Sequence, residues 1–180
     1  MRSAQRTLYY IRSIKVPRYR SMFPLPLTDK LTNMLNAKYV RPTIFKASNA
    51  AQLRRNAASF LQSAKDAKQP PIVRYALAYE AVHALAIGFL YLHALAPTGG
   101  DGHRIRAIGT LLDHVGLELD IDDRIEIEHA ARERNDKIYE SPAPPPSARQ
   151  AIDLIESVVR VEVLVKRLVP TWYSLEVGNS

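Results

Sequence analysis

Cysteine is absent from this chain of 180 residues. Its absence excludes disulfide bonds, thiolate metal ligands and cysteine nucleophiles, and it fits a reducing compartment, so the expected location is the cytoplasm. The first residues also lack the short apolar core and small-residue cleavage site of a secretory signal. No H-x3-H or H-x2-E pair is present either, so we expect no bound metal and no cofactor.

Acidic residues are nearly missing from the first third of the chain. Residues 1–55 carry twelve Lys or Arg and a single acid, whereas residues 56–180 carry 13 basic and 17 acidic residues. A basic arm can neutralise phosphates and gain from counterion release, which makes RNA an expected partner. The alternative is a solvated arm that lies on the acidic body of its own or a second subunit. The arm residues assigned to RNA binding are Arg12, Lys15, Arg18 and Arg20.

Alternating strand patterns are not found, and helical spacing dominates from residue 48 onward. Four prolines interrupt residues 1–47, which we expect to form an irregular basic arm with one short helix near residues 28–38. Residues 48–170 predict a helical bundle, and residues 171–180 a C-terminal tail. The fold class is therefore expected to be all-α, a bundle of about five helices with short loops.

The first two helices of the bundle are marked by their ends. Apolar residues up to position 64 follow one helical face that begins near a Ser48 or Asn49 cap. Pro71 suits the first position of the next helix, where a missing amide hydrogen costs nothing. That helix is apolar on almost every side, but its uninterrupted run between His83 and His93 is far shorter than the ~20 residues of a membrane span. We therefore expect a central helix and no membrane association.

Three later segments have local signals of their own. The stretch "PTGGDG" follows a helix in this reading, so it predicts a turn with left-handed glycines and not a phosphate-binding loop. Asp120, Asp122 and Asp123 open the next helix, where carboxylates suit exposed amides, and we assign them to capping and not to catalysis. Ser147 and Gln150 predict a capping box at the start of the last helix.

The segment "RERNDKIYES" ends the penultimate helix with polar residues. Ile127, Ala131, Arg134 and Ile138 are spaced by four, three and four, so one line along the helix carries three apolar groups and one guanidinium. An arginine on such a line needs an anionic partner, either a carboxylate or a phosphate. Asn135 lies beside it, and Tyr139 follows four residues later.

This arrangement resembles the R-x4-6-H motif of the HEPN superfamily (higher eukaryotes and prokaryotes nucleotide-binding). The similarity includes the apolar helix "RYALAYEAVHALAIGFLYLHAL", the glycine turn before "HRIRAIGTLL" and the closing helix after a proline break, over roughly residues 48–169. Many HEPN proteins are metal-independent RNases that dimerise so that two motifs share one cleft, in toxin–antitoxin, phage-defence and RNA-processing systems.

The resemblance implies a homodimer and a catalytic set of Arg134, Asn135 and Tyr139. Arg134 would hold the scissile phosphate, and Asn135 would be the polar residue that follows it. Tyr139 stands where the motif has histidine, and a phenol with a pKa of about 10 is a poor base at neutral pH, so the expected endoribonuclease activity is impaired.

Two alternatives to this hypothesis remain. One is a non-catalytic interaction or adaptor subunit, in which Arg134 pairs with a carboxylate such as Glu133 or Glu128 of a partner chain and the arm binds RNA or protein. The partner would then be a second copy, a cognate antitoxin or another protein. The other is an unrelated helical bundle whose arginine makes only an interface ion pair.

Overall fold

The structure is a computed structural model, and it describes residues 23–100, 102–135 and 144–175. Most of these residues are helical, so the all-α class is confirmed. In chain order the elements are α1 (Asp29–Asn36), β1 (Val40–Pro42), α2 (Ala47–Ala64), α3 (Pro71–Leu92), β2 (Leu95–Pro97), α4 (His103–Val115), the 3-10 turn η2 (Gly116–Glu118), α5 (Ile121–Asn135), α6 (Ala148–Leu168) and α7 (Pro170–Tyr173).

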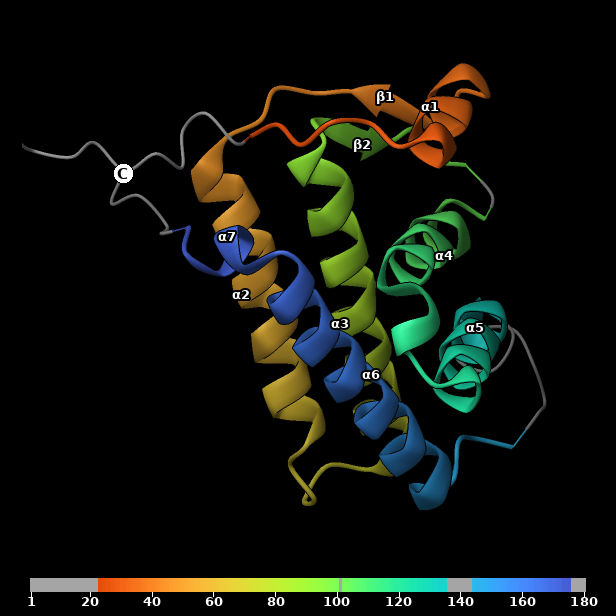
Figure 1. Ribbon diagram of the computed structural model, residues 1–180. Coiled ribbons are helices and arrows are strands. Elements are labelled where there is room, and N and C mark those ends of the chain that lie inside the picture. Colours follow the sequence, from red (N-terminus) through yellow and green to blue (C-terminus); the bar gives the residue numbers. More distant parts are fainter. Residues whose placement is uncertain (1–22, 101, 136–143, 176–180) are drawn as a thin grey trace, which may run out of the picture.

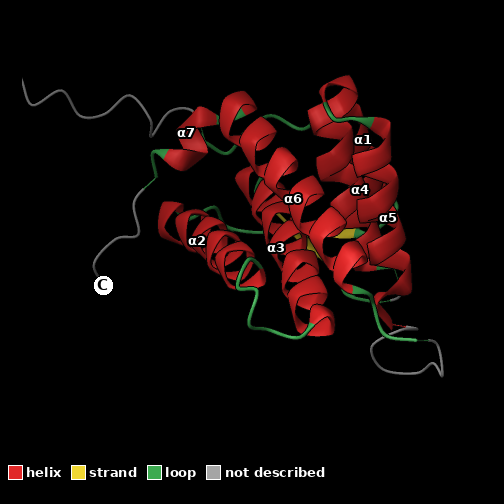
Figure 2. Cartoon of the chain, turned by 90° about the horizontal axis from the view of Figure 1, so that it is seen from below, coloured by secondary structure: helices red, strands yellow, loops and turns green. Residues whose placement is uncertain are grey.

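Helix α3 is the centre of the bundle, as its all-round apolar sequence predicts. It contacts α2, α4, α5 and α6: α2 lies on one side, α4 and α5 lie on the other, and α6 crosses in front of α3 in the view of Figure 1 (Figures 1 and 2). Pro71 occupies its first turn as expected. By length and composition α3 could cross a membrane, alone among the helices of the described ranges, and 61% of its apolar window is buried inside the structure.

Residues 23–46 pack on the bundle and are not a separate arm. The expected short helix is α1, capped by the Thr28 hydroxyl, which accepts a hydrogen bond from the Leu31 amide at 3.3 Å. Leu31 is fully buried and Val40 is 2% exposed, so both belong to the core. The packed unit therefore begins well before residue 48, the start of the bundle that the helical spacing predicts.

The two strands were not expected from the sequence. β1 and β2 pair antiparallel, with Val40 opposite Pro97, and cover one end of α3 (Figure 1). Each is three residues long, too short for an alternating pattern to be recognised.

The chain also stays packed beyond residue 170. Pro170 begins the short helix α7, and Trp172 is fully buried. The Trp172 indole donates a hydrogen bond to the Ala50 carbonyl at 2.8 Å, which fastens α7 to α2. Its ring also lies against Gly88 of α3, where a Cβ atom would come within 2.3 Å of the ring. The expected C-terminal tail thus contributes one of the largest side chains of the core.

The local signals at helix ends were right in part. The capping box at Ser147 and Gln150 is confirmed. The proposed cap at Ser48 or Asn49 is wrong, because α2 begins at Ala47 after Lys46, whose side chain makes no cap hydrogen bond. Gly99, Gly100 and Gly102 have positive φ angles, which confirms the left-handed turn, although the turn follows β2 and not a helix directly.

Candidate functional site

The C-terminal turn of α5 carries the predicted catalytic arginine. Ile127 and Ala131 are buried, and Arg134 occupies the next position of their line in the helix. The side chains of Arg134 and Asn135 and the whole of Tyr139 lie outside the described residues. Their catalytic assignment therefore stays a prediction. The same holds for the arm residues Arg12, Lys15, Arg18 and Arg20, which also lie outside the described ranges.

Carboxylates on α5 are engaged within the chain. Glu128 pairs with Arg124 at 2.9 Å and with Arg132 at 3.8 Å, and Glu133 pairs with His129 at 3.1 Å. A partner arginine would have to displace these contacts. The alternative in which Arg134 pairs with Glu128 or Glu133 of a second chain therefore carries an added cost.

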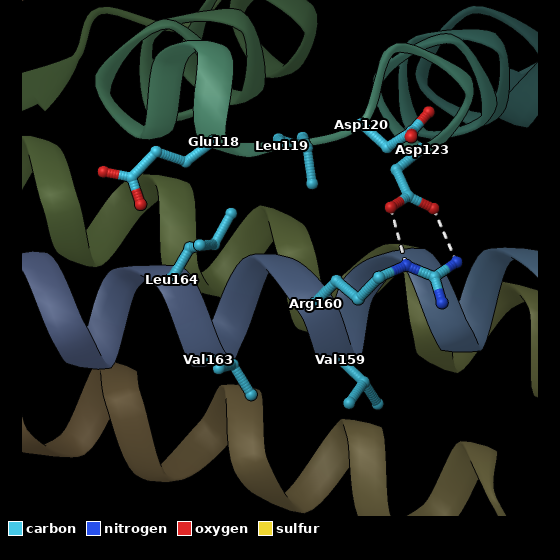
Figure 3. A pocket seen from close by; sticks show the side chains of 8 residues that line it. All are labelled: Glu118, Leu119, Asp120, Asp123, Val159, Arg160, Val163 and Leu164. Atoms are coloured by element: carbon cyan, nitrogen blue, oxygen red, sulfur yellow. Dashed lines mark hydrogen bonds and ion pairs between the residues drawn. The ribbon is translucent and has the colours of Figure 1, made fainter.

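Asp123 makes a buried ion pair that capping does not explain. It is 5% exposed, and both of its oxygens accept hydrogen bonds from Arg160 of α6 at 2.6 Å (Figure 3). The buried Ser157 hydroxyl donates a third at 2.8 Å. Burial alone would raise the pKa of Asp123, but the bonds from Arg160 and Ser157 hold that pKa below its ordinary value. The capping assignment is wrong for Asp123, whereas Asp120 does accept a hydrogen bond from the Asp122 amide at 2.9 Å.

A pocket of about 270 Å³ lies between η2, the start of α5 and one side of α6. Apolar side chains form much of its wall, and Arg160 and Leu164 extend from α6 toward the segment that carries Leu119 and Asp123 (Figure 3). Both oxygens of Asp123 are occupied by donors of the same chain. The pocket is thus an apolar hollow with charged edges, without a described group arranged for acid–base chemistry.

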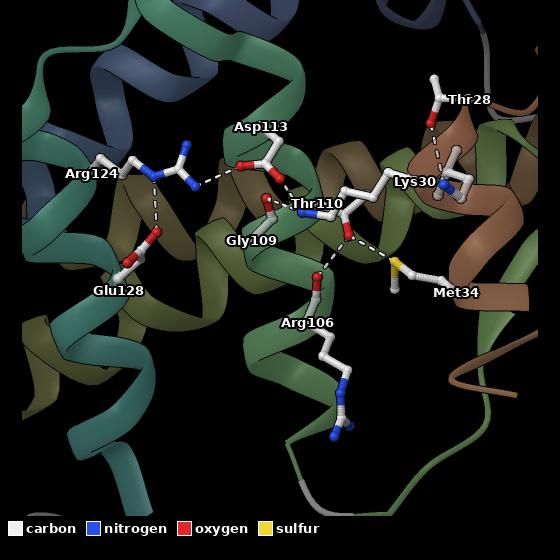
Figure 4. A network of polar contacts seen from close by, with 10 residues as sticks. Thr28, Lys30, Met34, Arg106, Gly109, Thr110, Asp113, Arg124 and Glu128 are labelled. Carbon is white, nitrogen blue, oxygen red and sulfur yellow. Dashed lines mark hydrogen bonds and ion pairs between the residues drawn. The ribbon is translucent and has the colours of Figure 1, made fainter. Parts of the chain in front are cut away.

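A second polar network fastens α1 and α5 to α4 (Figure 4). Lys30 of α1 and Arg124 of α5 both bind Asp113 of α4, Arg124 at 2.6 Å. Burial would raise the pKa of Asp113, and the two cations outweigh that effect and lower it. Arg124 also pairs with Glu128 at 2.9 Å, so two cations face two carboxylates. Because these groups are partly exposed and pair with one another, we regard the network as structural.

Two histidines meet near the glycine turn. The Glu80 carboxylate of α3 binds Arg104 of α4 at 3.0 Å and lies 3.6 Å from His83 Nδ1. The His103 ring stands edge-on to His83, with centroids 6.5 Å apart, and its Nδ1 lies 2.7 Å from the Gly100 carbonyl oxygen. Among the described residues, no group of three or more His, Cys, Asp or Glu side chains could hold a metal ion.

The exposed basic residues at the β1 end of the molecule have no acid near them in sequence. Between Asp29 and Asp66 the chain carries no acidic residue at all. Lys38, Arg41 and Lys46 are exposed, and the structure gives them no ion pair with another described residue. Together these three residues define what we call the basic face. A group of exposed cations in a segment without acids is the electrostatic footprint of a polyanion site.

An aromatic side chain lies beside the basic face. Tyr39 is 43% exposed, and the Arg106 guanidinium stacks over its ring at 4.0 Å. The Thr98 hydroxyl donates to the Lys38 and Tyr39 carbonyls at 2.9 and 3.2 Å. The glycine turn, which follows Thr98, therefore begins beside Lys38 and Tyr39. Exposed rings and guanidinium planes are surfaces on which single-stranded bases stack.

The start of the described chain lies next to this face. The Phe23 ring stacks on Phe45, with centroids 5.1 Å apart, and Phe45 immediately precedes Lys46. Phe23, the first described residue, therefore lies beside the basic face, and residues 1–22, which precede it in the sequence, carry six Lys or Arg and no acid. The basic arm of residues 1–47 predicted from the sequence includes Lys38, Arg41 and Lys46, but its RNA-binding assignment falls on other cations nearer the N-terminus.

Comparisons with protein-family models, with curated proteins and with solved structures found no match to this chain. The HEPN resemblance therefore rests on the sequence features described above.

Proposed function

We propose that this chain is a HEPN-like RNA-binding protein that holds single-stranded RNA on its basic face. The observation that carries the proposal is the exposed set Lys38, Arg41 and Lys46, to which the structure gives no ion pair within its described ranges, with Phe23 stacked on Phe45 next to Lys46. Phosphates would contact these cations, and a base would stack on Tyr39 and Arg106. Such binding does not select a sequence strongly, because it uses the backbone and ring faces.

The resemblance adds an enzymatic form of this proposal, a metal-independent endoribonuclease of toxin–antitoxin or defence type. Arg134, Asn135 and Tyr139 would act on RNA that the basic face holds. With tyrosine in place of histidine, cleavage would be slow. The other form of the proposal is a non-catalytic adaptor that binds RNA and a partner protein.

Binding and cleavage are tested separately. Binding is measured by fluorescence anisotropy of a labelled mixed-sequence single-stranded RNA at several salt concentrations. We expect an affinity that falls steeply with salt, and a smaller salt slope after deletion of residues 1–20. No binding at low salt would overturn the proposal, and an unchanged slope would remove the arm from it.

Cleavage is measured with the same RNA in EDTA, beside an Arg134→Ala variant. The enzymatic form predicts cleavage that is lost in Arg134→Ala and accelerated in Tyr139→His. RNA binding without cleavage in any variant would leave the adaptor as the function. Equal cleavage by the parent and Arg134→Ala would show a contaminating nuclease and remove Arg134 from the site.

A further inference from the structure

Residues 23–28, which we call the anchor segment, are held on the bundle by few contacts. Every side chain in the segment is at least partly exposed, so its release would uncover little apolar surface. Pro24 and Pro26 have no amide hydrogen to donate, and the Leu25 amide donates to the Leu92 carbonyl at 2.8 Å. The segment can therefore open while the core of the bundle stays folded.

His93, directly after α3, supplies a second hydrogen bond to the anchor segment. Its side chain is 7% exposed, and its Nδ1 lies 2.7 Å from the Pro26 carbonyl oxygen. Because a carbonyl oxygen can only accept, Nδ1 carries the hydrogen of the neutral ring and Nε2 carries the lone pair. Nε2 is buried and has no hydrogen-bond partner among the described residues. A proton on Nε2 would therefore bring a charge and an unpaired N–H group into a buried place.

The groups around His93 do not compensate for such a charge. The Phe89 ring of α3 contacts both His93 and His114 of α4, with centroid distances of 4.9 and 4.5 Å. In the described ranges, neither of these histidines has an ion pair with a carboxylate. Asp113 precedes His114 in α4, but it is bound by Lys30. A charged His114 would repel a second positive charge on His93.

We propose that His93 makes the docking of the anchor segment sensitive to pH, so that the neutral ring holds the segment against the end of α3 and the protonated ring releases it. Burial lowers the pKa of His93, and a charge on His114 lowers it further, against the opposite effect of the Pro26 and Leu25 carbonyls. In the open form the ring is in water and has its ordinary pKa of about 6.5. The open form therefore binds more protons, so the closed form is most stable above about pH 6.5 and loses stability as the pH falls below that value.

Release of the segment has a consequence for RNA that rests on the proposed function. Phe23 belongs to the anchor segment, and its ring stacks on Phe45, next to Lys46 of the basic face. Once Phe23 has left, a base can stack on the Phe45 ring. The affinity for single-stranded RNA should therefore rise at least roughly twofold more in the parent than in His93→Gln between about pH 7.5 and about pH 5.5. Equal rises would overturn this link, whereas absence of RNA binding at either pH would overturn the proposed function alone.

Hydrogen–deuterium exchange of the full chain without RNA tests the docking itself. Exchange of the Leu25 amide, corrected for its intrinsic rate, should accelerate roughly tenfold between about pH 7.5 and about pH 5.5, because the ring in the open form becomes protonated over this range. The amide of Leu85, which is buried in the middle of α3, should not accelerate. His93→Gln keeps an N–H donor for Pro26 but does not titrate, so it should abolish the acceleration. His114→Gln is the matched control and should retain most of it.

Two results of the exchange experiment would overturn the proposal. One is an equal acceleration in the parent and in His93→Gln, and the other is an equal acceleration of the Leu25 and Leu85 amides, which would mean that the whole bundle opens. A titration of the parent by NMR needs no substitution. The His93 ring should titrate with a midpoint below about pH 6.5, and a midpoint at or above that value would contradict the proposal.

Discussion

The ion pair between Asp123 and Arg160 leads to a quantitative prediction about stability. Asp123 is 5% exposed and receives two hydrogen bonds from Arg160 at 2.6 Å, besides the one from Ser157. Arg160→Met keeps an aliphatic stem along α6 but leaves the carboxylate with a single donor. Breaking a buried pair from one side costs about 3–5 kcal/mol. Because Arg160 itself is half exposed, we expect a loss of about 2–3 kcal/mol in the free energy of unfolding.

The same helix offers a matched control. Arg149 pairs with Asp153 one turn away at 3.0 Å, and its side chain is 81% exposed. Arg149→Met should cost no more than about 0.5 kcal/mol, the usual value of an exposed pair in a helix. Urea unfolding at neutral pH measures both variants. Equal losses of unfolding free energy in Arg160→Met and Arg149→Met would show that the buried Asp123 pair is no more stabilising than the exposed pair.

The pair also predicts a pH dependence with a definite sign. The folded pKa of Asp123 is lowered, so its contribution to stability is present above the unfolded pKa of about 3.9 and is lost as the pH falls through the folded pKa. In Arg160→Met, the buried Asp123 carboxylate loses its positively charged partner, so its pKa in the folded protein rises. The variant should then lose stability at a higher pH than the parent does, and parallel stability–pH curves would refute this.

Two further predictions concern the core. Gly88→Ala should lower the free energy of unfolding by about 1–3 kcal/mol, because the added Cβ atom would clash with Trp172. Gly109→Ala in α4 should raise it by about 0.5–1 kcal/mol, because no other atom lies near that Cβ position. Equal effects of the two substitutions would contradict this packing. Burial lowers the pKa of His93, whose Nδ1 lies 2.7 Å from the Pro26 carbonyl oxygen. Stability should therefore fall as the pH drops below about 6.5, and His93→Gln should reduce that fall.

The sequence predicted those features that depend on neighbouring residues. The all-α class, the central position of α3, the short helix α1 and the capping box at Ser147 all follow from local spacing or from one side chain. Contacts between distant residues were missed. Asp123 and Arg160 are 37 residues apart, and nothing local distinguishes Asp123 from its acidic neighbours as the one that faces α6. Trp172 was placed in a tail for the same reason, because Ala50 and Gly88 become its neighbours only in the folded chain.

The candidate site was predictable to a smaller degree. Positive charge near the N-terminus was visible in the sequence, but its position on the fold was not. The stacking of Phe23 on Phe45 decides where the arm begins, and the pairing of β1 with β2 orders the segment that carries Arg41. The spacing placed Arg134 on the buried line of α5, and its role stays a prediction.

The central claim, that RNA lies on the basic face, is tested most directly by two charge reversals that alter net charge equally. Arg41→Glu/Lys46→Glu changes the β1 end of α2, and Lys65→Glu/Lys68→Glu changes the opposite end (Figure 1). Anisotropy with single-stranded RNA at moderate salt should show at least a roughly tenfold weaker affinity for the first variant and at most about a threefold change for the second. Equal losses in the two variants would mean that only net charge matters, and would contradict a site on this face.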